Sequence, residues 1–131
     1  MRTLNRNQFI KLYYKLIVWT LVIAYLCFSP ADEFKKVHIT IPHFDKLVHF
    51  GMFFIAGILL SMLYRQKPTL IHKLWLPLLF LWYAVMIEVI QHFYIYTRSG
   101  DSMDGLADIL GLFIGWWLFN LLSKKRKEIT H

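Results

Sequence analysis

Ionisable and hydrogen-bonding side chains interrupt an apolar sequence at short, regular spacings. Asp45 and His49 lie four positions apart, and Glu88, Gln91 and His92 follow one another at i, i+3 and i+4, so each group shares one stripe of a helix. An ionisable group inside an apolar helix is costly in a bilayer and by default marks a site that has a partner. We therefore expect these two stripes to contribute to one polar site.

A polar turn after residue 96 brings further groups of this kind. Arg98 carries a planar guanidinium that suits bidentate binding of a carboxylate or phosphate. Asp101 and Asp104 have a simpler interpretation as a helix N-cap and a first-turn carboxylate. Asp108 lies one turn further along the same face, where capping does not explain it. The stretch Gly111–Gly115 continues this face with a small-xxx-small pattern that allows a close helix approach.

The elements that position these residues are expected to be membrane helices. The chain of 131 residues is 57% hydrophobic and 18% aromatic, and its apolar runs approach the ~20 residues that a helix needs to cross a bilayer. We predict an all-α integral membrane protein, a four-transmembrane-helix bundle forming one domain over residues 1–131. The expected helices are roughly Leu12–Phe28, Phe44–Tyr64, Leu74–Tyr96 and Asp104–Leu122. A β-barrel is not expected, because these runs do not alternate between apolar and polar residues.

The basic residues indicate how the helices are oriented. Eleven of the fifteen Lys and Arg residues precede the first helix or lie in its first turn, connect the second and third, or follow the fourth. The positive-inside rule then places both termini in the cytoplasm and the connections at 31–42 and 97–101 outside. The formal charge of +7 does not indicate a nucleic-acid partner, because the charges are divided between helix ends. The single cysteine, Cys27, excludes an intrachain disulfide.

Three ordered motifs within residues 44–118 resemble the signature of the VanZ-like family of small bacterial membrane proteins. They are Asp45-Lys-Leu-Val-His49-Phe, Glu88-Val-Ile-Gln91, and the run from Arg98 through Asp101, Asp104 and Asp108 to Gly111 and Gly115. The resemblance implies a multi-pass protein of the bacterial cytoplasmic (inner) membrane. It also implies a connection with resistance to the glycopeptide teicoplanin, with which the family's named member is associated. Many members have asparagine where this chain has Asp108, so the exchange adds an ionisable group.

The favoured function is a non-catalytic envelope protein with an outward-facing polar cleft. The cleft would bind an envelope lipid, a lipid-linked cell-wall precursor or a lipoglycopeptide antibiotic, and Arg98 would hold an anionic group. The bilayer itself is the other expected partner. The residues expected to bind the ligand are Asp45, His49, Glu88, Gln91, Arg98, Asp101, Asp104 and Asp108.

Catalysis is the alternative, as an intramembrane hydrolase or transferase acting on an envelope lipid. His49 or Glu88 would act as general base, Arg98 would stabilise developing charge, and Asp104 would assist. A metal-dependent version would draw its ligands from His49, Glu88, His92, Asp104 and Asp108. No HExxH spacing or clear nucleophile supports catalysis. A proton-linked transporter, which would have to oligomerise, is a third candidate. The sequence does not select a cofactor. Each of the three hypotheses requires site residues that are far apart in the sequence to lie close together in the fold.

Overall fold

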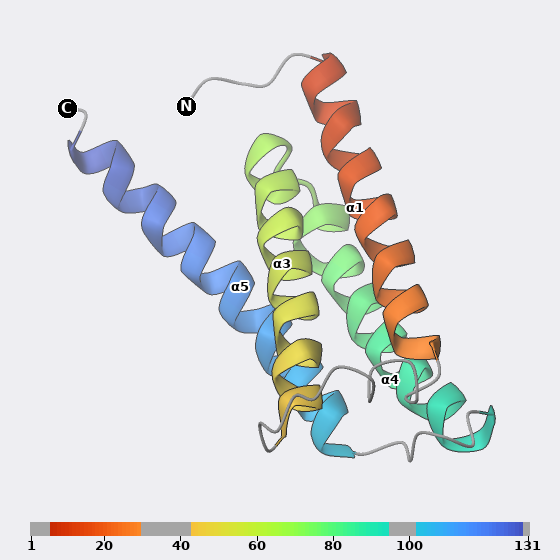
Figure 1. The fold of residues 1–131 in the computed structure, drawn as a ribbon. Helices are drawn as coiled ribbons and strands as arrows, with labels where there is room; N and C mark the ends of the chain where they lie inside the picture. Colours follow the sequence, from red (N-terminus) through yellow and green to blue (C-terminus); the bar gives the residue numbers. More distant parts are fainter. Residues whose placement is uncertain (1–5, 30–42, 95–101, 130–131) are drawn as a thin grey trace.

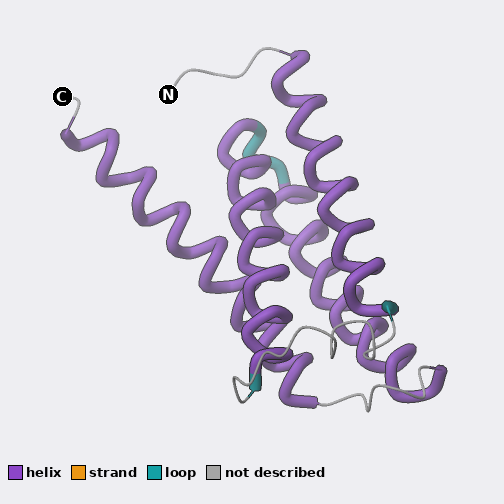
Figure 2. Tube along the Cα trace, in the orientation of Figure 1, coloured by secondary structure: helices purple, strands orange, loops and turns teal. Residues whose placement is uncertain are grey.

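The computed structural model describes residues 6–29, 43–94 and 102–129 as a set of helices (Figure 1). Helix α1 spans Arg6–Phe28, α3 spans Phe44–Gln66, and α5 spans Ser102–Ile129. A short π-helical segment, η1 at Ile71–Trp75, leads into α4 at Leu76–Tyr94. Figure 2 shows that helix predominates in the described ranges, with a short loop between α3 and η1 and no strand. The all-α prediction is confirmed.

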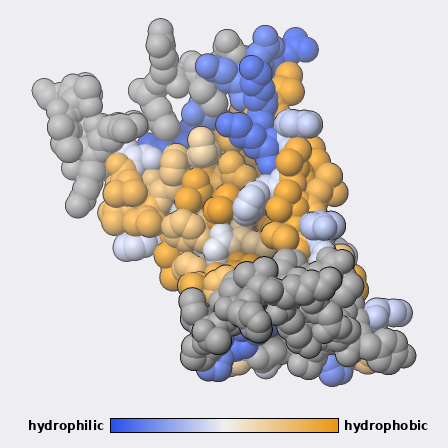
Figure 3. Space-filling view, in the orientation of Figure 1, coloured by the Kyte–Doolittle hydropathy of each residue, from blue (hydrophilic) through white to orange (hydrophobic). Residues whose placement is uncertain are grey.

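The four long helices have the length and apolarity of membrane spans. Within the described residues these spans have 23 or 24 residues each, with mean hydropathy between 1.6 and 2.0. At ~1.5 Å per residue, such a helix is about 35 Å long and exceeds the ~30 Å of bilayer hydrocarbon. Figure 3 shows an apolar belt around the middle of the molecule, with hydrophilic residues gathered where α1 begins. The predicted multi-pass membrane architecture is confirmed.

The first and last helices extend beyond their predicted ends. Helix α1 begins at Arg6 instead of Leu12, and α5 continues to Ile129 instead of ending at Leu122. Arg and Lys have high helix propensities, so a helix continues past the apolar run that identifies it. Helix α1 begins and α5 ends at the same end of the bundle (Figure 1). That this end faces the cytoplasm stays a prediction. Tyr96, the predicted end of the third span, lies outside the described residues.

A π-helical turn explains why the third span starts earlier than Leu74. Pro77 has no N–H and cannot continue an ordinary i to i−4 ladder. Immediately before it, the Leu76 N–H donates to the carbonyl oxygen of Ile71, five residues back. The wider turn thus accommodates the proline, and the span runs without a break from Ile71 into α4.

Helix α3 is the centre of the bundle and packs most extensively against α5. A Cβ atom added at Gly57, Gly111 or Gly115 would lie 2.1–2.3 Å from a backbone carbonyl oxygen of the facing helix. Only glycine fits at such a distance, so the two backbones are in direct contact. The close helix approach expected at Gly111 and Gly115 is present. Gly57 on α3 makes a third contact of the same kind, with the backbone of α5.

Helix α1 covers α3 and α4 through an apolar core and hydrogen bonds between helices. Trp19 Nε1 donates to the α3 backbone at 2.9 Å, and the Tyr83 hydroxyl of α4 donates to the α1 backbone at 2.9 Å. Gln91 Nε2 donates to the carbonyl oxygen of Cys27 at 2.8 Å. Hydrogen bonds of this kind satisfy polar groups that lipid cannot, and they hold α1 in register.

Candidate functional site

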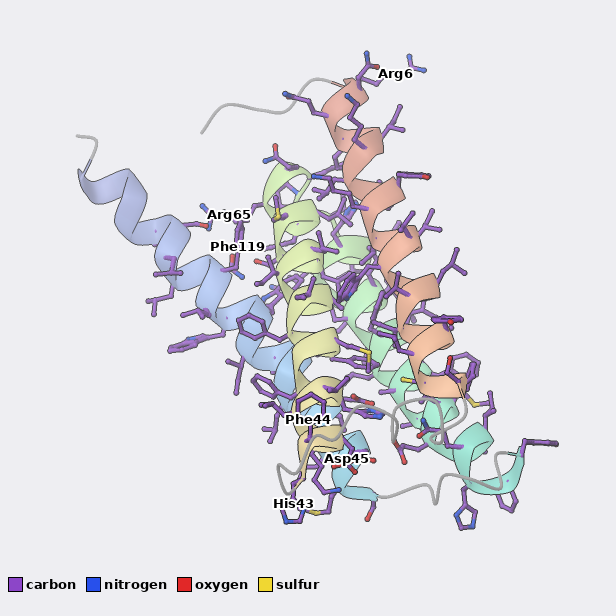
Figure 4. All side chains as sticks on the ribbon, viewed as in Figure 1. Arg6, His43, Phe44, Asp45, Arg65 and Phe119 are labelled. Atoms are coloured by element: carbon purple, nitrogen blue, oxygen red, sulfur yellow. The ribbon has the colours of Figure 1, made fainter. Side chains whose placement is uncertain are left out.

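Four ionisable side chains meet at one end of the bundle, where α3, α4 and α5 come together. They are His49 on α3, Glu88 on α4, and Asp104 and Asp108 on α5, and we call them the polar cluster. One nitrogen of His49 and one oxygen each of Glu88 and Asp104 all lie within 4.8 Å of one another. In Figure 4 the label of Asp45 marks this end of α3, and that of Arg65 marks the opposite end.

The central contact of the polar cluster joins His49 and Asp108. His49 Nδ1 lies 3.0 Å from Asp108 Oδ1, and the two side chains are 4% and 0% exposed. An ionised carboxylate can only accept a hydrogen bond, so with Asp108 ionised and the ring neutral, Nδ1 carries the proton and Nε2 keeps its lone pair. Oδ2 of Asp108 is also buried and has no hydrogen-bond partner among the residues that the structure describes.

Lys46 connects the polar cluster to its exposed edge. Its Nζ lies 3.1 Å from Asp104 Oδ1 and 3.5 Å from Asp45 Oδ2. The side chain of Asp104 is 10% exposed, whereas that of Asp45 is 60% exposed. Although Asp45 and His49 lie four positions apart on one helix, Asp45 pairs with Lys46 and His49 with Asp108. Lys46 is not among the predicted site residues, although its spacing of three from His49 places it on the same face.

Glu88 approaches α5 at a glycine. A Cβ atom added at Gly105 would lie 3.3 Å from Glu88 Cγ, which is tighter than ordinary van der Waals contact. Glycine at this position leaves room for the α4 side chain beside Asp104 and Asp108. Sequence reasoning missed the role of Gly105, because its contact depends on a helix far away in the chain.

Gln91 and His92 do not join the polar cluster. Gln91 is 2% exposed but points to α1, where it donates to Cys27. His92 is exposed and packs edge-on against Phe93, with ring centroids 4.9 Å apart. Positions i+3 and i+4 flank position i and lie about 100° apart around a helix, so Gln91 can face α1 while His92 faces outward. His92 is therefore no metal-ligand candidate here. Arg98 and Asp101 lie outside the described residues.

An apolar groove of about 330 Å³ lies between α1 and α4, away from the polar cluster. Its lining includes Ile17, Phe80 and Trp82 and is almost entirely apolar. In a bilayer such a groove suits a hydrocarbon chain. It therefore differs from the polar cleft expected from the sequence.

The side chains of the polar cluster can do three kinds of chemistry. Carboxylates and an imidazole can bind a group that is cationic or donates hydrogen bonds, exchange a proton, or ligate a metal ion. Charges in a membrane interior are weakly screened, so each of these interactions is stronger than at a protein surface.

Comparison with known families places the whole arrangement in context. The family model described as VanZ/LLP1 matches residues 2–123. The chain belongs to the VanZ/LLP1 family. The VanZ/LLP1 match covers the first three spans and the fourth up to residue 123, and it contains the entire polar cluster, whereas the motif resemblance reaches only residues 44–118. No curated protein and no solved structure matches the chain.

Proposed function

We propose that this VanZ/LLP1 protein is a non-catalytic protein of the bacterial envelope membrane that binds the polar headgroup of an amphiphile. The convergence of His49, Glu88, Asp104 and Asp108 from three helices carries the proposal. The amphiphile is an envelope lipid, a lipid-linked cell-wall precursor or a lipoglycopeptide antibiotic, all of which join a polar head to a hydrocarbon tail. Binding of the last two would link the protein to teicoplanin resistance.

The chemistry of the polar cluster suits a sugar-bearing or amine-bearing headgroup. Carboxylates of Glu88 and Asp104 accept hydrogen bonds from hydroxyl or ammonium groups, and the latter are charge-assisted. Lys46, which contacts Asp104 at 3.1 Å, supplies positive charge for a phosphate or carboxylate of the same headgroup. The hydrocarbon tail would lie along the apolar belt of the helices (Figure 3).

The position of the polar cluster supports an encounter from outside the cell. It lies at the end of α3 that is distant from Arg65 (Figure 4). The positive-inside rule assigns the Arg65 end to the cytoplasm, so the polar cluster would lie in the outer half of the membrane. Envelope precursors after translocation, and antibiotics added to cells, are both present on that side.

A binding assay on the full chain in nanodiscs tests the proposal. The probes are teicoplanin, its deacylated form and an undecaprenyl-linked disaccharide, each titrated by microscale thermophoresis. We expect at least one acylated or prenylated probe to bind, with affinity reduced at least about tenfold in Glu88→Gln and Asp104→Asn, as for loss of one charge-assisted hydrogen bond. The matched control is His92→Gln, an exposed side chain outside the polar cluster that should retain binding. Failure of every probe, or equal binding by all variants, refutes the proposal.

One contact favours catalysis as a second candidate. The Asp108 carboxylate orients Nδ1 of His49, as in a general base held by an acidic residue, and leaves Nε2 to take a proton. The protein would then be an intramembrane hydrolase or transferase of an envelope lipid. Mass spectrometry of the same probes after incubation separates the two candidates. A product that disappears in His49→Gln establishes catalysis, and unchanged probes that bind support the binding protein.

A further inference from the structure

We propose that the polar cluster is a binding site for one divalent cation of the Zn²⁺ or Mn²⁺ type. The ligands would be one ring nitrogen of His49 and one carboxylate oxygen each of Glu88 and Asp104, contributed by three different helices. We assign the ring nitrogen to Nε2, because Nδ1 contacts Asp108. The inference goes beyond the proposed function, because the ion would bind whether or not an amphiphile does.

The spacing of the three donor atoms is close to that of a metal site. One ring nitrogen of His49 and one oxygen each of Glu88 and Asp104 all lie within 4.8 Å of one another, and two ligands of a tetrahedral ion with bonds of ~2.0–2.1 Å are about 3.3 Å apart. Ion binding would draw the three side chains together through changes in their torsions. The helix backbones need not move, and around Gly111 and Gly115 they are held by direct contact.

A second observation points independently to an ion at this place. Histidine ligands of metals usually donate their other ring N–H to a carboxylate, which fixes the tautomer and aims the free nitrogen at the metal. Asp108 does this for His49 at 3.0 Å, and both side chains are buried. Oδ2 of Asp108, buried and without a hydrogen-bond partner in the described part of the chain, can accept a hydrogen bond from a metal-bound water.

The ligand types select the ion. One imidazole and two carboxylates suit Zn²⁺ or Mn²⁺, whereas Mg²⁺ and Ca²⁺ prefer oxygen ligands alone. Asp104 could serve both the ion and Lys46, because a carboxylate has two oxygens and Lys46 Nζ contacts Oδ1 at 3.1 Å. Three protein ligands leave at least one coordination position for water or a headgroup oxygen.

Metal binding is measured on the tag-free full chain in detergent, stripped with a chelator and then titrated with Zn²⁺ or Mn²⁺. We expect about one tightly bound ion per chain by mass spectrometry of the eluted metal. His49→Gln, Glu88→Gln and Asp104→Asn should each weaken binding by more than tenfold, and Asp108→Asn by about 10 to 100-fold, as for the loss of an outer-shell partner. The matched control is His92→Gln, an exposed histidine outside the polar cluster, which should bind as the wild type does.

Pulsed electron paramagnetic resonance of the Mn²⁺-loaded wild type provides a test that needs no variant. Coupling of the ion to one imidazole nitrogen is expected, and its absence overturns the inference. Substoichiometric metal in the wild type, or equal binding by the ligand variants, does the same. Repeating the amphiphile titrations in chelator separates the two proposals. Retained binding of the probe without metal preserves the proposed function even where the metal site fails.

Discussion

Replacing Gly115 by alanine should force α3 and α5 apart, whereas the same replacement at Gly51 should not. A Cβ atom at Gly115 would lie 2.1 Å from the carbonyl oxygen and 2.9 Å from the carbonyl carbon of Phe54. Both are backbone atoms, so no side-chain rotation relieves the contact. A Cβ atom at Gly51 meets nothing within 4 Å. Both glycines lie inside helices, and the comparison therefore isolates the interhelical contact from helix propensity.

The expected magnitudes follow from these distances. Ordinary contact begins at 3.4 Å, so the backbones near Gly115 must separate by about 1.3 Å, and overpacking of this kind costs about 1–3 kcal/mol. The higher helix propensity of alanine offsets up to ~1 kcal/mol of this loss in stability. We expect Gly115→Ala to lower the free energy of unfolding by about 0–2 kcal/mol and Gly51→Ala to raise it by ~0.5–1 kcal/mol. The 3.0 Å contact between His49 and Asp108 joins the same two helices, so it should lengthen in Gly115→Ala and stay unchanged in Gly51→Ala.

Reversible unfolding in mixed micelles, followed by far-ultraviolet circular dichroism, measures these free energies. Nitrogen-15 chemical shifts of His49 in the folded protein report whether its hydrogen bond to Asp108 persists. Equal free energies for Gly51→Ala and Gly115→Ala would show that α3 and α5 do not make backbone contact. That result would refute the account of how the polar cluster is assembled.

Three further predictions concern individual contacts and the orientation of the chain. Asp108→Ala leaves the buried Nδ1–H of His49 without its acceptor and should lower the free energy of unfolding by ~1–3 kcal/mol. Asp45→Ala, at an exposed position, should change it by no more than ~0.5 kcal/mol. Equal shifts of the two variants in thermal unfolding would contradict the pairing of His49 with Asp108. Gln91→Leu keeps the side-chain volume and should cost ~0.6–1.7 kcal/mol through loss of the bond to Cys27, and no loss in the same assay would rule out that bond. Reporter fusions that are active only in the cytoplasm should be active at both termini. An inactive fusion at either terminus would contradict the predicted cytoplasmic location of both termini.

The fold was largely predictable because membrane helices are recognised by a local property. The run Phe44–Tyr64 is apolar over a length that crosses a bilayer, and α3 occupies it with the same first residue. The ends of α1 and α5 were less predictable, since basic residues beyond the apolar run remain helical. The π-helical turn before Pro77 was not predicted, although the proline itself is the signal for it.

The candidate site was predictable in part. Spacing identifies His49, Glu88 and Asp108 as misplaced in apolar helices. The structure brings these three together with Asp104, which the sequence also explains as a first-turn carboxylate. Spacing does not identify partners. Asp45, four positions from His49, pairs instead with the neighbouring lysine.

The sequence alone determined that this protein crosses the membrane in four helices and which of their residues are too polar for lipid, because both follow from the composition of short segments. Only the tertiary structure decided that His49 meets Asp108 and that Gln91 turns away to α1. Such partnerships depend on the rotation of each helix about its axis and on the distance between helices. Direct backbone contact at the α3–α5 glycines sets both quantities for the polar cluster, and no single segment contains that information.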